Sequence, residues 1–366
     1  MNNLSKHALL HWSCLVATVA APFLFPDFNT QLATLWLMII VALTWDMTGG
    51  QMGYNSLGNI AFYGIGMYVA AVVTIGMVYD VGEYTNAFGG GVYKFTDAQY
   101  FTGMAVGVVA AGVFCALCAL VIGYITFGLR GPYFAIGTLG VAIAAGELVS
   151  NWDWVGGGQG IALPVYPGDL DTGKIVFYFL FAATGLALFV FLKWLYQTRF
   201  GAAINAVRDD EEKAEAMGLH TLRYKLFTWA MAAFFVGVAG GISAFQLIHF
   251  EPLETAFQTI NLGIFMVVCV LLGGKGTLWG PVVGAVLFHF FKEVTWTYLL
   301  GWQWVALGAL IVVTVVYFQD GVMGYLMHRK PEWFGIRVEQ RAAGNADTVT
   351  AVDGANSARA ESSSNR

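Results

Sequence analysis

Runs of about 20 apolar residues recur along most of this chain, and this recurrence is the strongest constraint on its fold. Within a bilayer, backbone polar groups must find their hydrogen bonds inside the protein, so long apolar segments there fold as helices. Of the 366 residues, 58% are hydrophobic and 11% are charged, whereas an ordinary soluble domain carries about 25% charged residues. The sequence therefore predicts an all-α polytopic membrane protein with about ten spans, in a range of about eight to ten.

One long polar interval, residues 199–225, interrupts the apolar runs. Asp209 is expected to cap a short helix there, with Glu212 reaching back to it three residues later. Gly218 is a natural stop for that helix. The helix also has a narrow apolar edge, formed by Ala214, Met217 and Leu222. We therefore expect a short capped helix that lies against a neighbour and is gripped by a partner protein.

A second unusual stretch, residues 45–68, places glycines and amides inside apolar surroundings. Such groups are costly against lipid, so this backbone is expected to line a cavity or to pack against other helices. A helix broken in this way indicates a transport site, and close helix packing is the alternative. The residues assigned to a translocation path or to packing here are Gly50, Gln51, Gly53, Asn55, Ser56, Gly58 and Asn59.

Residues 273–285 form a third glycine-rich stretch, which follows an apolar run. Gly276, Gly280 and Gly284 recur every four residues and are expected to leave one helix face bare, so that another backbone can approach closely. A proline is tolerated in the first turn of a helix. The residues assigned to the path or to packing here are Gly274, Gly276, Thr277, Gly280, Pro281 and Gly284.

Several ionisable residues fall within expected spans, where they are functional suspects by default. Glu147 lies near the end of one span and could equally sit at the membrane interface. His289 and Glu293 share a helix face, with Lys292 beside them. This group could be a proton relay, a substrate contact or a self-satisfied polar cluster, and the alternatives stay open.

The distribution of bases predicts the orientation, because Lys and Arg gather on the cytoplasmic side. Residues 193–225 hold six of the eighteen bases. The loop 199–225 and both termini are therefore expected in the cytoplasm. The first span, Trp12–Phe25, is expected to be retained as an uncleaved membrane anchor. Residues 1–330 form the predicted membrane domain, and residues 331–366 a disordered cytoplasmic tail.

Other functional classes find little support. The pattern G-x-x-x-x-G-K-[ST] is absent from the sequence, so no P-loop for ATP is expected. Cys115 and Cys118 form a C-x-x-C spacing inside an apolar run and are predicted to be packing residues. No catalytic residue, metal site, cofactor or nucleic-acid partner is predicted for this chain.

A family resemblance is carried by motifs in four regions that occur in the expected order. Residues 212–218, Glu-Lys-Ala-Glu-Ala-Met-Gly, resemble the E-A-A-x-x-x-G cytoplasmic loop of ABC-importer permeases, with Lys213 in place of the first Ala. Residues 50–68 and 129–139 resemble the corresponding stretches of branched-chain amino acid (LIV-type) permeases, and residues 273–285 match their G-G-x-G-T-x-x-G-P-x-x-G-A pattern. The resemblance covers about residues 35–325.

The resemblance implies a permease subunit of a bacterial inner-membrane importer. Such a chain pairs with a second permease, binds two cytoplasmic ATP-binding subunits and receives solute from an external binding protein. The residues expected to contact the ATPase are Arg208, Asp209, Asp210, Glu212, Ala214 and Gly218. Branched-chain amino acids are the leading substrate, followed by urea, short amides or aromatic acids. An ion-coupled secondary transporter is the alternative class, and a membrane-embedded enzyme is the other rival.

Overall fold

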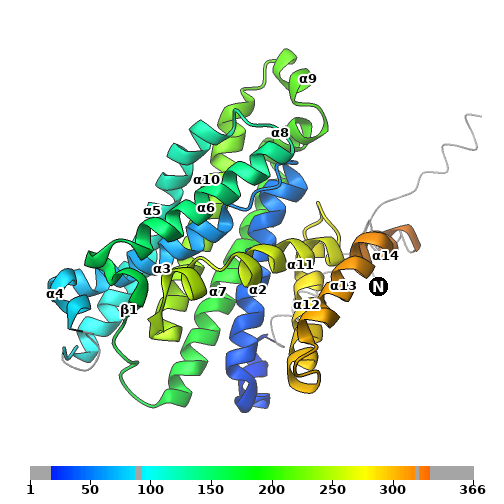
Figure 1. Cartoon of the computed structure of the whole chain (residues 1–366). Coiled ribbons are helices and arrows are strands. Elements are labelled where there is room, and N and C mark those ends of the chain that lie inside the picture. The colour runs from blue at the N-terminus through cyan, green and yellow to red at the C-terminus, as the bar shows by residue number, and fades with distance from the viewer. Residues whose placement is uncertain (1–17, 88–92, 318–320, 330–366) are drawn as a thin grey trace, which may run out of the picture. The chain divides into compact units, whose positions relative to one another are not determined.

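The computed structural model describes residues 18–87, 93–317 and 321–329, and these residues are helical almost throughout (Figure 1). The chain divides into two compact units, residues 1–323 and 324–366. The α-helices are α2 (Asn29–Asp46), α3 (Asn59–Gly76), α4 (Val81–Asn86), α5 (Asp97–Thr126), α6 (Pro132–Ser150), α7 (Leu170–Tyr196), α8 (Arg199–Asp209), α9 (Glu211–Ala216), α10 (Thr221–Leu247), α11 (Phe265–Gly273), α12 (Gly280–Tyr298), α13 (Gln303–Tyr317) and α14 (Gly321–Arg329).

Short irregular helices fill several of the connections. The 3₁₀ turns are Pro26–Phe28, Asp153–Val155 and Gly157–Gln159, and the π-helical segments are Met47–Gln51, Pro252–Ala256 and Thr259–Ile264. Two-residue strands, β1 (Ile161–Ala162) and β2 (His249–Phe250), pair antiparallel with Ile161 opposite Phe250. Because β2 follows the last residue of α10, this small sheet lies at the end of α10 farthest from α9.

The structure confirms the prediction of an all-α polytopic membrane protein. Among the described residues, six helical segments are long and apolar enough to cross a membrane, and two shorter apolar helices, Leu262–Gly273 and Gln303–Thr314, add to them. The six are Pro26–Gln51, Asn59–Gly76, Asp97–Thr126, Pro132–Ser150, Leu170–Tyr196 and Thr221–Leu247.

The structure has fewer candidate spans among its described residues than the ten expected from the sequence, for the following reasons. The expected short second span, 32–44, is part of the longer segment Pro26–Gln51. Helix α12 was expected to span but is not among the six, because its polar residues His289, Lys292 and Glu293 lower its mean hydropathy. The expected first span, 12–25, falls within the described residues only from residue 18 onward, and the tail 331–366 lies outside them.

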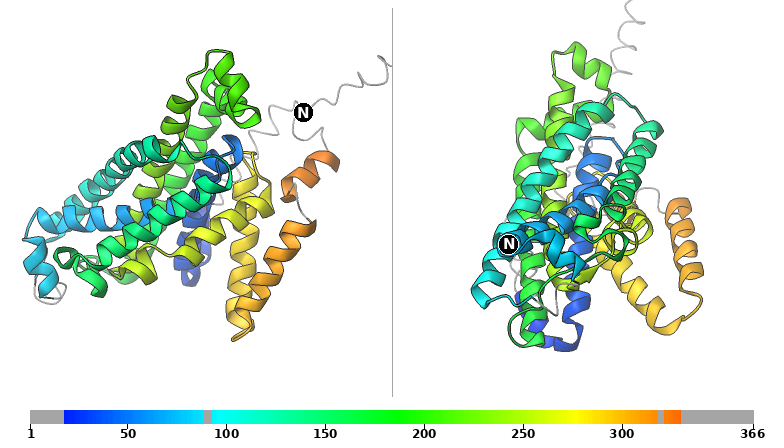
Figure 2. Two further views of the ribbon diagram at one scale, coloured as in Figure 1. Left: turned by 45° about the horizontal axis from the view of Figure 1, so that its top comes forward. Right: turned by 60° about the vertical axis from the view of Figure 1, so that its left-hand side comes forward.

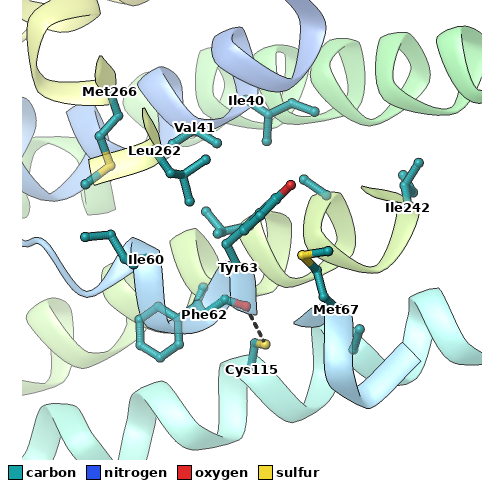
Figure 3. Close-up of a cluster of buried hydrophobic side chains, with 14 of the residues drawn as sticks. Ile40, Val41, Ile60, Phe62, Tyr63, Met67, Cys115, Ile242, Leu262 and Met266 are labelled. Atoms are coloured by element: carbon teal, nitrogen blue, oxygen red, sulfur yellow. Dashed lines mark hydrogen bonds between the residues drawn. The ribbon is translucent and has the colours of Figure 1, made fainter. Parts of the chain in front are cut away.

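The interior of the first unit is built mainly from α2, α3 and α10, whose candidate spans are mostly buried, whereas α5, α6 and α7 are mostly exposed. Helix α10 packs against α5 and α3, α2 packs against α7, and α11 packs against α12 (Figure 2). Figure 3 shows one buried cluster, in which Ile40 of α2, Met67 of α3 and Ile242 of α10 converge. The thiol of Cys115 in α5 donates a hydrogen bond to the carbonyl oxygen of Phe62 at 3.2 Å. Cys115 is therefore a buried packing residue, as predicted.

A break between α2 and α3 is present where the glycines and amides predicted one. Helix α2 continues as the π-helical segment Met47–Gln51, residues 52–58 are not helical, and α3 begins at Asn59. Gly53 has φ +83°, in the left-handed region that favours glycine. We call residues 47–58, the π-helical segment together with the non-helical residues after it, the helix break.

Candidate functional site

The polar interval folds into two short helices at one end of α7 and α10 (Figures 1 and 2). Helix α8 begins after Thr198, whose hydroxyl accepts a hydrogen bond from the backbone N–H of Phe200 at 3.3 Å. Helix α8 includes Asp209, and Asp210 then adopts an extended conformation with φ −163°. The carboxylate of Asp210 accepts from the backbone N–H of Lys213 at 3.1 Å and so caps α9.

The predicted cap was therefore wrong by one residue. Asp209 cannot cap α9 because it still belongs to α8, and Glu212 does not reach back to it but pairs with Arg130 at 2.9 Å. Gly218, with φ +87°, follows the end of α9 as predicted.

The predicted apolar edge of α9 is only partly formed. Ala214 is buried, so α9 does lie against a neighbour. Met217 is 83% exposed and Leu222 is also exposed, because the chain turns at Gly218 and directs these side chains away from the packed face. Arg208 pairs with Asp209 at 3.0 Å on the surface. The loop thus exposes charged groups and the large apolar side chains of Met217 and Leu222.

Beneath that surface, a buried ion pair joins α9 to α10. The ammonium group of Lys225 lies 2.6 Å from Glu211, and their side chains are 4% and 14% exposed. Glu211 also accepts hydrogen bonds from the Thr221 hydroxyl at 3.2 Å and from the Tyr54 phenol. The Lys225 ammonium lies 4.8 Å from the Tyr54 ring centroid and 5.4 Å from that of Phe127, within the range of cation–π attraction. We call Tyr54, Glu211 and Lys225 the lock.

The lock sets the charge state of its acid. Burial raises the pKa of Glu211, but the hydrogen bonds from Lys225 and Tyr54, with the positive charge of Lys225, outweigh it and hold the pKa below its ordinary value. Burial and the hydrogen bond to Glu211 raise the pKa of the Tyr54 phenol. Glu211 is therefore ionised and Tyr54 is a neutral donor at neutral pH. Because Tyr54 belongs to the helix break, the lock connects α9 directly to that break.

The break in turn contacts the third glycine-rich stretch. The Gln51 side-chain amide donates to the carbonyl oxygen of Gly276 at 2.8 Å, and the Gly276 N–H donates to the buried carboxylate of Asp46 at 2.8 Å. A Cβ at Gly50 would lie 2.7 Å from the nitrogen of Gly276, so a larger residue would push the two segments apart. Lys275 donates to the Asn55 side chain at 3.3 Å. Gln51 and Gly276 are 225 positions apart in the sequence, so these hydrogen bonds join two distant stretches of the chain.

The remaining predicted residues of the break are packing residues in this structure. Ser56 is buried and accepts hydrogen bonds from the N–H of Gly58 at 3.0 Å and from the indole of Trp229 at 3.2 Å. The Asn59 amide donates to the hydroxyl of Thr44 at 3.3 Å. A Cβ at Gly53 would lie 3.0 Å from the Arg208 side chain, which brings the break close to α8.

The predicted glycine stripe is shorter than expected. Gly276 precedes α12 and has φ +77°, so it belongs to the connecting loop and not to the helix face. The hydroxyl of Thr277 accepts from the N–H of Gly280 at 3.0 Å, and Pro281 lies in the first turn of α12 as predicted. A Cβ at Gly284 would lie 1.8 Å from the carbonyl oxygen of Cys269. Gly280 similarly abuts the carbonyl oxygen of Gly274, so α12 packs against α11 at backbone distance.

Comparison with known proteins shows the family of the chain. The family described as "Branched-chain amino acid transport system / permease component" matches residues 29–326. The chain belongs to this family. The resemblance seen in the sequence is thereby confirmed, and the chain is a transport permease component and a multi-pass membrane protein.

Individual relatives come from several transport systems. The branched-chain amino acid permease proteins LivM of Salmonella typhimurium and Escherichia coli are each 26% identical to the chain, with 87% of this chain and 75% of the relative covered. The fructose import permease protein FrcC of Rhizobium meliloti is also 26% identical, with 69% of each chain covered. No solved structure matches the chain.

Sequence reasoning missed the residues that bind this permease component's loop to its interior. None of Tyr54, Glu211 and Lys225 was assigned to a site from the sequence. A signal existed for Lys225, because a lysine at the border of an apolar run needs an acceptor if it is buried. No comparable signal existed for Tyr54, since a tyrosine in a glycine-rich stretch has many roles.

The other ionisable suspects form no joint site. Glu147 is exposed on α6. His289 is buried, but within the described residues no hydrogen bond or ion pair links it to Lys292 or Glu293. The Lys292 ammonium instead lies 5.9 Å from the ring of Trp296. The alternatives named for this group, a proton relay, a substrate contact or a self-satisfied polar cluster, therefore stay predictions.

Proposed function

We propose that this chain is the permease subunit of an ATP-driven importer in a bacterial inner membrane. It pairs with a second permease, binds two cytoplasmic ATP-binding subunits and receives its solute from an external binding protein. ATP is bound by the partner chains, so this chain needs no cofactor. The loop 199–225 and both termini lie in the cytoplasm, in line with the concentration of bases in that loop.

The lock is the observation that carries this proposal. The segment around α9 has Asp209 (the end of α8) and Met217 (just after α9) on its outer side, while Glu211 on the inner side of α9 is held by Lys225 and Tyr54. An ATPase that grips the outer face and moves α9 would therefore pull on the helix break. Since the break contacts Gly276, the movement would reach both glycine-rich stretches and open the path alternately to each side.

Branched-chain amino acids are the proposed substrate, because LivM proteins cover most of the chain. The fructose and autoinducer 2 permeases among the relatives make a sugar-like solute the main competitor, and urea, short amides and aromatic acids follow. Competition by leucine, fructose, urea and phenylacetate against labelled leucine uptake in reconstituted vesicles separates these classes. Strong competition by leucine analogues supports the proposed substrate.

The coupling role is tested with Met217→Asp, because this exposed side chain can change without loss of a buried contact. Leu170→Asp is the matched control, since Leu170 is an exposed apolar residue at the far end of α7. We expect Met217→Asp to reduce both copurification of the ATP-binding subunit and ATP-dependent uptake about thirtyfold, the effect of losing a hot-spot contact of about 2 kcal/mol, and Leu170→Asp to change neither. Uptake without an ATPase, or uptake abolished by collapse of an ion gradient, would instead indicate a secondary transporter.

A further inference from the structure

A groove unconnected with the lock lies where α8 meets the start of α10. Gly218, Leu219, His220 and Arg223 form one wall, Phe200, Tyr224 and Phe227 form the other, and the groove has a cavity volume of about 370 Å³. A second groove of about 440 Å³ continues outward over Gly218–Arg223 towards Glu215. We call the first of these the Arg223 groove.

The Arg223 groove has a largely aromatic wall. The ring of Phe200 lies 5.2 Å from that of Tyr224 and 5.1 Å from that of Phe227, measured between centroids. Phe227 is 45% exposed although it lies in the second turn of the candidate span α10. Phe200 follows the end of candidate span α7 by four residues. The groove therefore opens at the level where two neighbouring spans leave the apolar region, which is where aromatic rings gather in membrane proteins.

The charges around the groove are unbalanced in favour of bases. Two bases, His220 and Arg223, line the groove, and within the described residues their side chains form no ion pair or hydrogen bond. The acids of the same loop are engaged elsewhere, in pairs that join Asp209 to Arg208, Asp210 to Lys213, Glu211 to Lys225 and Glu212 to Arg130. Glu215, on the outer groove, lies 2.6 Å from the Thr221 hydroxyl, whose one hydrogen it shares with Glu211. The bases at the Arg223 groove thus remain available to an external anion.

We propose that the Arg223 groove binds the headgroup phosphate of an anionic phospholipid, whose acyl chains lie along Phe227 and the exposed face of α10. The basic wall supplies the attraction for the phosphate, and the aromatic wall supplies a surface for the glycerol and the upper chain. An anion that was fully soluble would gain nothing from an exposed phenylalanine inside a span. The site needs only that the chain is embedded in a membrane, so it does not depend on the proposed importer function.

The test measures lipid retention on the full-length chain. The purified protein is equilibrated with equal amounts of phosphatidylglycerol and phosphatidylcholine in detergent, and bound lipid is counted by native mass spectrometry. Arg223→Gln is compared with Lys213→Gln, which removes the same charge from the same loop but does not line the groove. Free glycerol phosphate is added in a separate arm, to distinguish a lipid from a soluble phosphate.

We expect the native chain to retain phosphatidylglycerol preferentially and Arg223→Gln to lose about fivefold in that retention, the effect of one base near an anionic headgroup. Lys213→Gln should retain it normally. Phe227→Ala, which leaves every charge in place, should also lower retention, and size exclusion with circular dichroism checks that each variant is folded. Equal retention of the two lipids, equal losses in both charge variants, or full displacement by free glycerol phosphate would each overturn the proposal.

Discussion

A lysine near the start of a membrane span needs an anionic partner, because removing an ammonium group from water costs several kcal/mol. Lys225 meets this need with Glu211, and the pair is buried at 2.6 Å. Removing one partner of a buried pair leaves the other charge uncompensated, and this destabilises the folded protein far more than removing both partners. The pair therefore contributes less to net stability than to fixing α9 in one position.

We expect Lys225→Met to lower the free energy of unfolding by about 3 kcal/mol, because it strands the carboxylate of Glu211. Lys213→Met, which removes an ion pair whose lysine side chain is 82% exposed, should cost less than about 1 kcal/mol. The double variant Lys225→Met, Glu211→Met should recover much of the loss. Urea denaturation in detergent measures all three, and similar losses for the two single variants would contradict a special role for the buried pair.

The same pair predicts a dependence on pH. The pKa of Glu211 lies below its ordinary value of 4.5, because hydrogen bonds from Lys225 and Tyr54 outweigh the effect of burial. A carboxyl whose pKa is depressed by folding stabilises the protein above its unfolded-state pKa, and this contribution is lost as the pH falls through the folded-state pKa. The stability advantage of the native chain over Glu211→Gln should thus hold from about pH 7 to about pH 5 and shrink below about pH 4.5. Denaturation midpoints at successive pH values test this, and an advantage independent of pH would exclude it.

At the scale of elements, the contact between α11 and α12 is a backbone contact with no room for a methyl group. A Cβ at Gly284 would lie 1.8 Å from the carbonyl oxygen of Cys269, so Gly284→Ala must separate the two helices. We expect a loss of about 2 kcal/mol, in the range of an overpacked core. Gly308→Ala in α13 is the matched control, since its Cβ would meet nothing within 4 Å, and it should stabilise by about 0.5 kcal/mol through helix propensity. Thermal unfolding of the two variants gives the comparison, and equal shifts would show that the contact is not restrictive.

Elements whose cause is local could be predicted from the sequence. Glycines and amides at residues 45–59 predicted the helix break, because they are costly against lipid wherever the chain folds. Pro281 was predicted in a first helical turn, because the N–H that proline lacks has no partner within the helix at that position. The cap of α9 was misplaced by one residue, since either Asp209 or Asp210 could cap a helix and tertiary contacts decide where α8 ends. Gly276 was misassigned because a four-residue repeat does not show where the helix begins.

Contacts between distant segments could not be predicted in this way. The hydrogen bond from Gln51 to Gly276 joins residues 225 positions apart. The local sequence of neither stretch indicates that the two are in contact. Tyr54 and Glu211 are separated by 157 positions, so the contacts of the lock could not be predicted from the sequence either. Family resemblance located the segments that matter, whereas the structure was required to show which side chains connect them.

At the scale of the whole molecule, these contacts form one continuous series across the first unit. Helix α9 is joined through Glu211 to Tyr54 in the helix break, and the break is joined through Gln51 to Gly276 before α12. A movement imposed on α9 can thus reach both glycine-rich stretches through hydrogen bonds between packed elements. The series contains one bond that can be removed without a change of shape, the bond donated by the Tyr54 phenol.

Tyr54→Phe tests whether the lock transmits this movement. The variant keeps the ring, and with it the cation–π contact with Lys225, but loses the hydrogen bond that the phenol donates to Glu211 and the one that it accepts from Lys225 at 3.2 Å. A hydrogen bond to a charged group is worth about 1.5–3 kcal/mol, so we expect uptake per ATP hydrolysed to fall about tenfold in vesicles that contain the assembled importer, while assembly and ATP hydrolysis persist. Tyr133→Phe is the control, because Tyr133 is 72% exposed at the start of α6. If the two variants transported equally well per ATP, the route from α9 to the path would not pass through Tyr54, and the exposed pair of Arg130 and Glu212 would be the next connection to break.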